Sequence, residues 1–277
     1  MSDPSPSLAD DHALLCKAVR SAGAAVVKRF KTRGLKSWHK QDRSPVTEAD
    51  LEANAILEEM LRAGARADYG WLSEESADDL QRLTARRVWI VDPIDGTRAF
   101  LEGRPEFAVC VALVEGTKAV ASAIYNPITD EFFEATLGGG AFCNSAPIRA
   151  SACDAVEQCR MLGWKHLFAH PQWLQPWPAM QVGYRNSTSY RMALVAKGEY
   201  DAALALLRKA DWDVAPGALI ASEAGAIASD HKGKEFRFNG VEPVQRALVC
   251  AAPGLYSQLV SRLNHLPADL REVTLSA

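Results

Sequence analysis

The segment from Asp92 to Thr97 reads Asp-Pro-Ile-Asp-Gly-Thr and holds the residue types best suited to chemistry. Its carboxylates, Asp92 and Asp95, follow directly after a short apolar run, and Gly96 permits a sharp turn and the close approach of a ligand. Such a loop can aim both carboxylates and a backbone carbonyl at one point, the oxygen-rich setting that Mg²⁺ prefers. Thr97 adds a hydroxyl that can orient a water. The alternative is an acidic turn in which Asp92 only caps a helix, because a D-x-x-D pair alone is a weak motif.

Two further carboxylates stand in distinctive surroundings. Glu74 lies in Leu-Ser-Glu-Glu at 72–75, and Asp213 lies in Trp-Asp-Val-Ala-Pro-Gly at 212–217. Proline is tolerated in the first helical turn, so Pro216 predicts a helix that begins close to Asp213. The carboxylate and the free N–H groups of that turn would then share the positive end of the helix, a good place for a phosphate held against a metal.

Asp50 stands at the start of another predicted helix. Ser-Pro-Val-Thr at 44–47 leads into this helix, with Thr47 as its N-cap and Asp50 three residues later. That spacing is typical of a capping box, in which the carboxylate accepts a hydrogen bond from the cap residue. A capped carboxylate is also well oriented, so the capping role is compatible with a second role for Asp50.

Hydrophobic spacing and turn residues predict the elements that position these groups. The predicted helices span about 10–30, 48–61, 188–197, 215–223 and 255–266. The predicted strands span about 88–91, 107–114, 119–125, 200–207 and 249–251. We expect a lobe of helices over a mostly antiparallel sheet in residues 1–150, which carries most of the metal ligands. A smaller α/β lobe in residues 151–277 would carry Asp213 and the substrate contacts.

The composition is that of an ordinary globular protein. Hydrophobic residues make up 48% of the 277 residues, and 31 basic against 34 acidic residues give a net charge of -3. This balance argues against a general nucleic-acid or membrane binder. We expect a cytoplasmic protein, because no apolar run reaches membrane-spanning length and the first residues lack the pattern of a signal peptide. Six cysteines without a C-x-x-C pair are expected to be reduced, buried thiols.

Taken together, these motifs resemble the inositol monophosphatase superfamily over nearly the whole chain, from about Asp10 to about Leu266. The motifs that carry the resemblance are Leu72-Ser73-Glu74-Glu75, Trp89 to Thr97, Trp212 to Gly217 and the glycine-containing turn Gly140 to Asn144. The resemblance implies an α+β fold, a layered α/β/α/β sandwich of the inositol monophosphatase and sugar phosphatase type. Its two lobes would share one active site.

The resemblance also implies a role for each matched residue. The ligands of two or three Mg²⁺ ions would be Glu74, Asp92, the carbonyl of Ile94, Asp95 and Asp213. Phosphate would bind at Asp95, Gly96 and Thr97 and beside Asp213. A metal-activated water would attack the phosphorus in line without a phosphoenzyme. The residues that help this water would be Glu74, Asp50, Thr97 and Asp95.

Substrate identity rests on fewer residues. Inositol-specific members carry an acidic residue just before the Trp-Asp motif, where this chain has Leu206, and a leucine cannot hydrogen-bond a polyol. The motifs Asp-x-Ser-Pro-Val-Thr-x-x-Asp at 42–50 and Leu-Ser-Glu-Glu at 72–75 instead look like the 3'(2'),5'-bisphosphate nucleotidase branch. Arg208 and Lys209 would then meet a second phosphate, or else form an ordinary solvated basic pair.

Two weaker features also bear on the substrate. The family's Gly-Ser/Thr-Ala segment corresponds to Asn-Ser-Thr at 186–188, where Asn186 can adopt a positive φ and Ser187 is a candidate substrate contact. Three tryptophans could stack on a base, although core packing or lobe contacts explain them more simply. They are Trp164, Trp173 and Trp177.

The substrate is thus a small phosphorylated metabolite, either an inositol monophosphate or a 3'(2'),5'-bisphosphate nucleotide. Histidinol phosphate or another sugar phosphate is the alternative. A different class of hypothesis is a non-catalytic regulator that uses this fold to bind RNA or a polymerase, against which the complete ligand set and the balanced charge argue. The family usually forms homodimers. Apolar residues in Phe107 to Val114 and Trp164 to Trp177 favour a dimer here as well.

Overall fold

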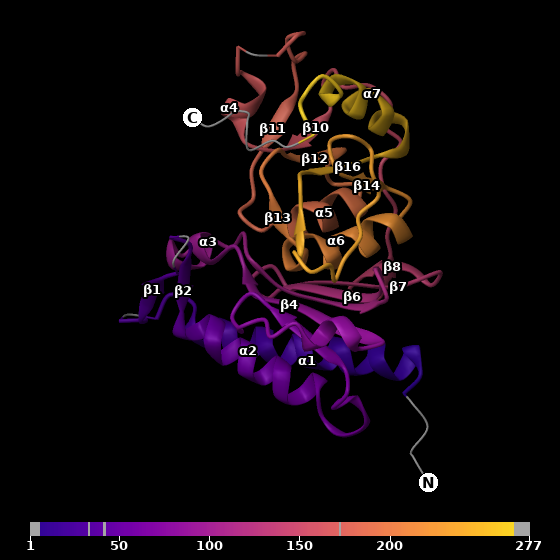
Figure 1. Ribbon diagram of the computed structural model, residues 1–277. Coiled ribbons are helices and arrows are strands. Elements are labelled where there is room, and N and C mark those ends of the chain that lie inside the picture. The colour runs from indigo at the N-terminus through magenta and orange to yellow at the C-terminus, as the bar shows by residue number, and fades with distance from the viewer. Residues whose placement is uncertain (1–5, 33, 41–42, 172, 269–277) are drawn as a thin grey trace.

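The protein is built in alternating layers of helix and sheet, seen edge-on in Figure 1. Helices α1 (Leu8–Arg29) and α2 (Glu48–Leu61) cover one face of a seven-stranded sheet. Helices α5 (Thr188–Ala196) and α6 (Asp211–Glu223) lie between that sheet and a second sheet, and α7 (Pro253–Leu263) covers the far side of the second sheet. The expected α+β layered sandwich is confirmed. This computed structural model describes residues 6–32, 34–40, 43–171 and 173–268.

The larger sheet runs β3-β4-β5-β6-β7-β8-β9, and its neighbours pair antiparallel except for β3 and β4. Its strands are β3 (Gly70–Ser73), β4 (Arg87–Asp95), β5 (Ala108–Glu115), β6 (Lys118–Asn126), β7 (Glu131–Thr136), β8 (Gly140–Cys143) and β9 (Ala146–Pro147). The expectation of a mostly antiparallel sheet is confirmed. The register of β4 against β5 shifts between Asp92 and Asp95, so the strand is irregular where the two carboxylates stand.

The second sheet has the order β11-β10-β12-β16-β14. Its strands are β10 (Arg160–Leu162), β11 (Gln181–Gly183), β12 (Ala202–Ala205), β14 (Ile227–Ser229) and β16 (Leu248–Ala251). Two further antiparallel strand pairs are β1 (Ser37–His39) with β2 (Pro45–Thr47) and β13 (Lys209–Ala210) with β15 (Val244–Gln245). The short helices of the described chain are α3 (Thr97–Leu101), α4 (Lys165–Phe168) and the 3-10 helices η1 (Gly64–Arg66) and η2 (Gln81–Thr84).

Strand β4 is buried on both faces because helices cover both sides of its sheet. Trp89 and Val91 pack in the hydrophobic cluster beneath α1 and α2, while Val88 and Ile90 pack in the cluster that contains α5 and α6. This alternation follows from the two-residue period of a strand and explains why the run is apolar at every position. Trp89 also donates from Nε1 to the carbonyl of Leu61 at the end of α2 (3.1 Å).

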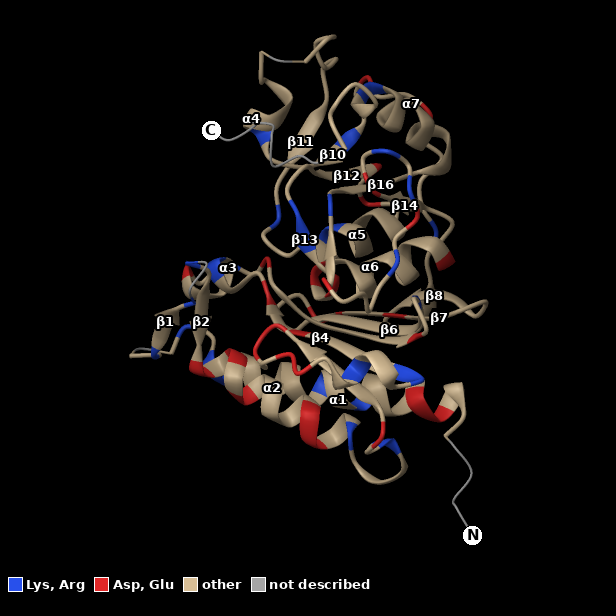
Figure 2. Ribbon diagram, in the orientation of Figure 1, with Lys and Arg blue, Asp and Glu red and all other residues tan. Residues whose placement is uncertain are grey.

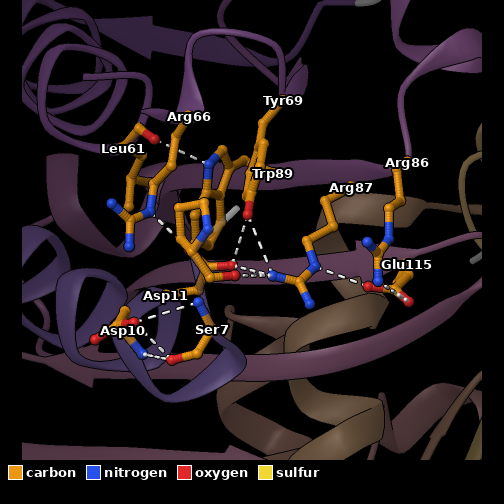
Figure 3. A network of polar contacts seen from close by, with 11 residues as sticks. Ser7, Asp10, Asp11, Leu61, Arg66, Tyr69, Arg86, Arg87, Trp89 and Glu115 are labelled. Carbon is orange, nitrogen blue, oxygen red and sulfur yellow. Dashed lines mark hydrogen bonds and ion pairs between the residues drawn. The ribbon is translucent and has the colours of Figure 1, made fainter. Parts of the chain in front are cut away.

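A polar network joins the start of α1 to the sheet, as Figure 3 shows. The fully buried carboxylate of Asp11 accepts hydrogen bonds from Arg66 Nε (2.6 Å), Arg87 Nη1 (2.6 Å) and the hydroxyl of Tyr69 (2.9 Å). Arg87 continues the network to Glu115 on β5 through Nε (2.7 Å). The buried charge is thus paired twice, as a carboxylate at this depth requires.

Several local predictions are confirmed. Helix α2 has the predicted bounds, and Thr47 and Asp50 form the predicted capping box, with Asp50 Oδ2 accepting from the Thr47 N–H (2.8 Å) and hydroxyl (2.6 Å). The six cysteines are free thiols as expected, but only four of them are buried, because Cys16 and Cys153 are partly exposed. No helix in the described part of the chain is both long and apolar enough to cross a membrane.

Helix α6 begins close to Asp213, as predicted, but earlier than the expected range of about 215–223, and the argument from Pro216 is wrong. The helix begins at Asp211, so Pro216 is its sixth residue and lies in the helix interior instead of the first turn. The carbonyl of Trp212, four residues earlier, therefore lacks its usual helical partner. Asp211 sets the early start, because its buried carboxylate accepts from the N–H of Asn239 (2.8 Å) and from Gln245 Nε2 (2.6 Å). The division into lobes near residue 150 stays a prediction.

Candidate active site

The structure brings three of the predicted site carboxylates together. One carboxylate oxygen from each of Asp92, Asp95 and Asp213 lies within 4.8 Å of the other two. Asp92 and Asp95 come from the end of β4, and Asp213 comes from the first turn of α6. Acidic segments of the ribbon accordingly gather where β4 ends and α6 begins (Figure 2). Such a concentration of buried negative charge is stable only with protons or a cation among the carboxylates.

Asp92 has an oxygen that no other described residue satisfies. Its Oδ1 accepts from the N–H of Ile94 (3.1 Å), whereas its buried Oδ2 has no hydrogen-bond partner. Burial, followed by the nearby charges of Glu74 and Asp95, raises the pKa of Asp92 well above its ordinary value. A bare, buried carboxylate oxygen of this kind fits a ligand position for a divalent cation.

Asp95 is held from the opposite side by the start of α5. Its Oδ2 accepts hydrogen bonds from the hydroxyl of Ser187 (2.7 Å) and the N–H of Ser189 (2.8 Å). Burial raises the pKa of Asp95 to about 7, the charge of Asp213 adds to the rise, and the two hydrogen bonds oppose it. The orientation of this carboxylate is therefore set by the beginning of α5, where Ser187 is the N-cap.

The start of α5 also contacts Asp213. The hydroxyl of Ser189 donates to its backbone carbonyl (2.8 Å), and its Oδ2 accepts from the N–H of Ala210 (3.2 Å). Lys209 Nζ lies 4.0 Å from Oδ2 and is the nearest cation that the structure pairs with this carboxylate. Gly217, one turn further along α6, packs against Met192 of α5, where a Cβ atom would lie 2.7 Å from the Met192 Cβ. The two helices can approach this closely only with glycine at that position.

Glu74 stands beside the three aspartates, but its carboxylate is paired with a lysine. Its N–H donates to the carbonyl of Val91 (3.1 Å), which ties the end of β3 to β4. Lys40 Nζ donates to Glu74 Oε1 (2.8 Å) and to Glu75 Oε1 (2.8 Å). Burial raises the pKa of Glu74, while Lys40 opposes the rise. The sequence analysis did not identify Lys40 as a site residue. Its only distinguishing feature in the sequence is its place in the basic stretch 28–43.

Thr97 connects two motifs of the site. Its hydroxyl lies 3.1 Å from Asp50 Oδ1 and 3.0 Å from the carbonyl oxygen of Ile94. Asp50 therefore caps α2 with one oxygen and faces Thr97 with the other, so the capping and site interpretations both hold geometrically. Burial raises the pKa of Asp50 to about 6, against the hydrogen bonds from Thr47. The role of the Ile94 carbonyl as a metal ligand stays a prediction.

Gly96 has a conformation that explains its place in the motif. Its φ is +104°, in the region that favours glycine, and an added Cβ would lie 2.9 Å from the carbonyl oxygen of Glu106. The glycine lets β4 turn directly into α3, so that Thr97 follows Asp95 on the inner side of the bend.

Comparison with known proteins agrees with this geometry. The family model described as the Inositol monophosphatase family matches residues 8–267. The chain belongs to this family. It is 34% identical over 270 residues to the inositol-1-monophosphatase of Rhizobium meliloti, a match that covers 94% of each chain. It is 32% identical over 270 residues to the histidinol-phosphatase of Chlorobaculum parvum, covering 94% of this chain and 98% of the relative.

Other relatives carry different names. The 3'(2'),5'-bisphosphate nucleotidase CysQ of Shigella flexneri is 31% identical over 229 residues, covering 79% of this chain and 90% of the relative. The crystal structure of the extragenic suppressor protein suhB from Bartonella henselae superposes with a TM-score of 0.79 at 31% identity and covers 92% of this chain and 98% of that one. Membership of the inositol monophosphatase family is therefore compatible with several substrates.

The residues predicted to contact substrate are placed differently from the metal ligands. Ser187 is fully buried and its hydroxyl serves Asp95, so it supports the site instead of reaching a substrate. Arg208 pairs with Glu242 (3.4 Å) at the surface, with its side chain 39% exposed. Leu206 is buried in the hydrophobic cluster beneath α7, which explains why no polar side chain stands there.

Asn186 and the three tryptophans are the other residues that the sequence related to the substrate. Asn186 does not adopt a positive φ, and its Oδ1 accepts from Arg104 Nη2 (3.0 Å). Trp173 and Trp177 pack against the cluster beneath α7, which agrees with core packing as the simpler explanation for them. Trp164 is partly exposed. Asp42, which opens the motif at 42–50, lies outside the described residues.

Proposed function

We propose that this protein is a Mg²⁺-dependent phosphomonoesterase that hydrolyses a small phosphorylated metabolite, an inositol monophosphate or a 3'(2'),5'-bisphosphate nucleotide. The observation that carries the proposal is the convergence of Asp92, Asp95 and Asp213, with Asp92 Oδ2 buried and unpartnered. The proposal is also supported by three relatives described above, which are named as phosphatases or as a nucleotidase and are therefore hydrolases.

The donor set fits a hard divalent cation, because it consists of oxygens alone. The residues that would hold Mg²⁺ are Asp92, Asp95, Asp213, the carbonyl of Ile94 and Glu74 once its carboxylate leaves Lys40. When bound, the metal would lower the pKa of a water and offset negative charge on the phosphoryl oxygens.

In this proposal, Asp50 and Thr97 would orient and deprotonate the attacking water. The Thr97 hydroxyl can accept a hydrogen bond from a water when its own proton points to Asp50 Oδ1. With a pKa of about 6, Asp50 is largely ionised at neutral pH and can receive a proton passed through Thr97. The capping bonds from Thr47 hold Asp50 in this orientation, so the same residues that start α2 also prepare the base.

Phosphate is assigned to the bend at 95–97 and to the first turn of α6. Gly96 allows the backbone to approach a ligand closely, and the N–H groups at the start of α6 carry partial positive charge, although that of Asp211 already donates to the carbonyl of Pro243. Lys209 adds a full positive charge beside Asp213. An anionic group of the substrate would be bound between these donors and the carboxylate cluster.

A phosphate-release assay tests the function. Purified protein is incubated with Mg²⁺ and with inositol 1-phosphate, 3'-phosphoadenosine 5'-phosphate or histidinol phosphate, each with a chelator control. We expect release from at least one compound that stops in chelator. No release from any of them, while binding of RNA or a polymerase is detected, would favour the non-catalytic regulator instead.

We also propose that the protein forms a homodimer. Residues 107–114, whose apolar character was one reason to expect a dimer, lie in or directly before β5 of the large sheet and are buried within one chain. These residues therefore do not support a dimer. The segment 164–177 still exposes Trp164 and Leu174. Light scattering at micromolar concentration tests the proposal, and a monomeric mass would contradict it.

A further inference from the structure

A second cluster of metal-binding side chains lies away from the acidic site, between α1 and the large sheet. His12 and Cys16 stand one helical turn apart on α1, so both face the same way. Glu134 stands opposite them on β7. It shares its face of β7 with Phe132, which is buried beneath α1, whereas Phe133 faces the other cluster. A carboxylate therefore occupies a helix-covered position where strand alternation would place an apolar residue.

The three ligand atoms form a compact triangle. Cys16 Sγ lies 3.1 Å from Glu134 Oε2 and 3.4 Å from His12 Nε2, and His12 Nε2 lies 3.2 Å from the same Glu134 oxygen. With Zn–N and Zn–S bonds of about 2.0–2.3 Å, one face of a zinc tetrahedron has edges of about 3.3–3.8 Å. The observed triangle needs to open by only a few tenths of an ångström to take this size.

The chemistry of the cluster selects a different ion from the acidic site. One thiolate, one carboxylate and one imidazole are the ligand types that Zn²⁺ binds, whereas Mg²⁺ prefers oxygens alone. A thiolate and a carboxylate would offset both charges of the ion. The side chains of His12 and Glu134 are 24% and 20% exposed, so water can reach the fourth position. Arg20 lies over the ring of Phe132, 3.7 Å from its centroid, and its positive charge also acts on Cys16 and Glu134.

We propose that His12, Cys16 and Glu134 form a Zn²⁺ site that joins α1 to β7, separate from the active site. Zinc displaces the thiol proton that Cys16 otherwise donates to Glu134 and leaves the proton to solvent. Because the ligands come from two elements, bound zinc fastens the first helix to the sheet.

Cobalt(II) provides the first test, since it substitutes for zinc and shows a thiolate charge-transfer band. Full-length protein freed of metal by chelator is titrated with Co²⁺. We expect the band in the wild type and in Asp213→Asn, and its absence in Cys16→Ser. Cys153→Ser, which removes another partly buried thiol, should keep the band. No thiolate band in the wild type, or an unchanged band in Cys16→Ser, would overturn the proposal.

Alkylation of Cys16 provides the second test and keeps the thiol as the reporter. Zn²⁺ should protect Cys16, mapped by peptide mass, but not Cys153 in the same molecule. Loss of an outer partner of a metal site weakens binding by about 10–100-fold, so loss of a direct ligand in His12→Ala or Glu134→Gln should weaken protection at least about 100-fold. Circular dichroism confirms that the variants are folded. If Zn²⁺ protected Cys16 equally in the wild type and in both variants, the zinc site would be contradicted. His12, Cys16 and Glu134 would then be only a hydrogen-bonded group.

Discussion

The hydroxyl of Thr97 lies 3.1 Å from the carboxylate of Asp50, and this contact joins the turn after β4 to the cap of α2. The other oxygen of Asp50 is occupied by both donors of Thr47. Asp50 therefore cannot rotate toward Thr97 or away from it without losing the cap. The start of a structural helix thus fixes the orientation of a proposed catalytic base.

This contact predicts that Thr97→Val loses activity without losing the fold. Valine matches the shape of threonine but has no hydroxyl to orient water, so kcat should fall by about 100-fold or more while KM changes little. Steady-state phosphate release measures the effect, and Thr117→Val in an exposed turn is the control. Asp50→Asn should have a similar effect, and the double variant should be no worse than the poorer single one. Additive losses would mean that the two residues act separately.

The acidic cluster predicts a strong dependence on each of its members. Asp92→Asn and Asp213→Asn each remove one ligand charge, so phosphate release should fall by about 1,000-fold or more at saturating Mg²⁺. Asp211→Asn is the control, because Asp211 lies in the same helical turn as Asp213 but its carboxylate bonds to the 239–245 segment. The Asp211→Asn variant should have a lower thermal stability, and its folded fraction should keep the wild-type kcat. Wild-type activity of Asp92→Asn would remove the metal assignment.

The raised pKa values predict how the metal-free protein responds to pH. The pKa of Asp95 is about 7 and that of Asp50 about 6, above the ordinary value of 3.8. Between the ordinary and the raised values the folded state binds more protons than the unfolded state. The stability that these two groups contribute is therefore full below about pH 4 and is lost as pH rises through about 7.

A thermal melt of Asp95→Asn in chelator tests this expectation. The amide carries no charge to desolvate, so the variant should melt above the wild type at about pH 8 and show a smaller difference at about pH 4.5. Saturating Mg²⁺ should favour the wild type at the higher pH, since only the carboxylate binds the ion fully. The same difference at both pH values would show that Asp95 does not titrate in this range.

Lys209 and Arg208 are expected to differ in their effect on substrates. Lys209 lies 4.0 Å from Asp213, whereas Arg208 pairs with Glu242 at the surface. Lys209→Ala should therefore raise KM for 3'-phosphoadenosine 5'-phosphate more than Arg208→Ala does. The effect should weaken at high salt because such contacts are screened. If inositol 1-phosphate is the better substrate and neither variant changes the ratio of kcat/KM values, the nucleotidase assignment fails.

Asp11 is expected to matter for stability alone. Asp11→Ala leaves Arg66 and Arg87 without their buried partner, and breaking a buried pair in this way costs about 3–5 kcal/mol of the free energy of unfolding. Asp10→Ala, the neighbouring change at an exposed position, should cost much less. Urea denaturation measures both. The kcat of the folded variants should equal that of the wild type, and a selective loss of kcat in Asp11→Ala would contradict a purely structural role.

The sequence was enough for features that depend on near neighbours. The bounds of α2 and its Thr47–Asp50 capping box follow from side-chain spacing within one helical turn. The apolar run of β4 and the motif that follows it single out Asp92, Asp95 and Thr97 as candidate site residues. These features are local, because hydrogen bonds three residues apart and strand alternation act within a short stretch of chain.

Only the tertiary structure decided which distant groups meet. It directs Ser187 to Asp95, Lys40 to Glu74 and Glu134 to Cys16. It also starts α6 at Asp211, whose carboxylate finds its donors in the segment 239–245. Each of these contacts joins residues brought together by the packing of helices on sheets, and no spacing in the sequence encodes such a distance. The sequence by itself thus determined the chemical groups, and the fold determined their partners.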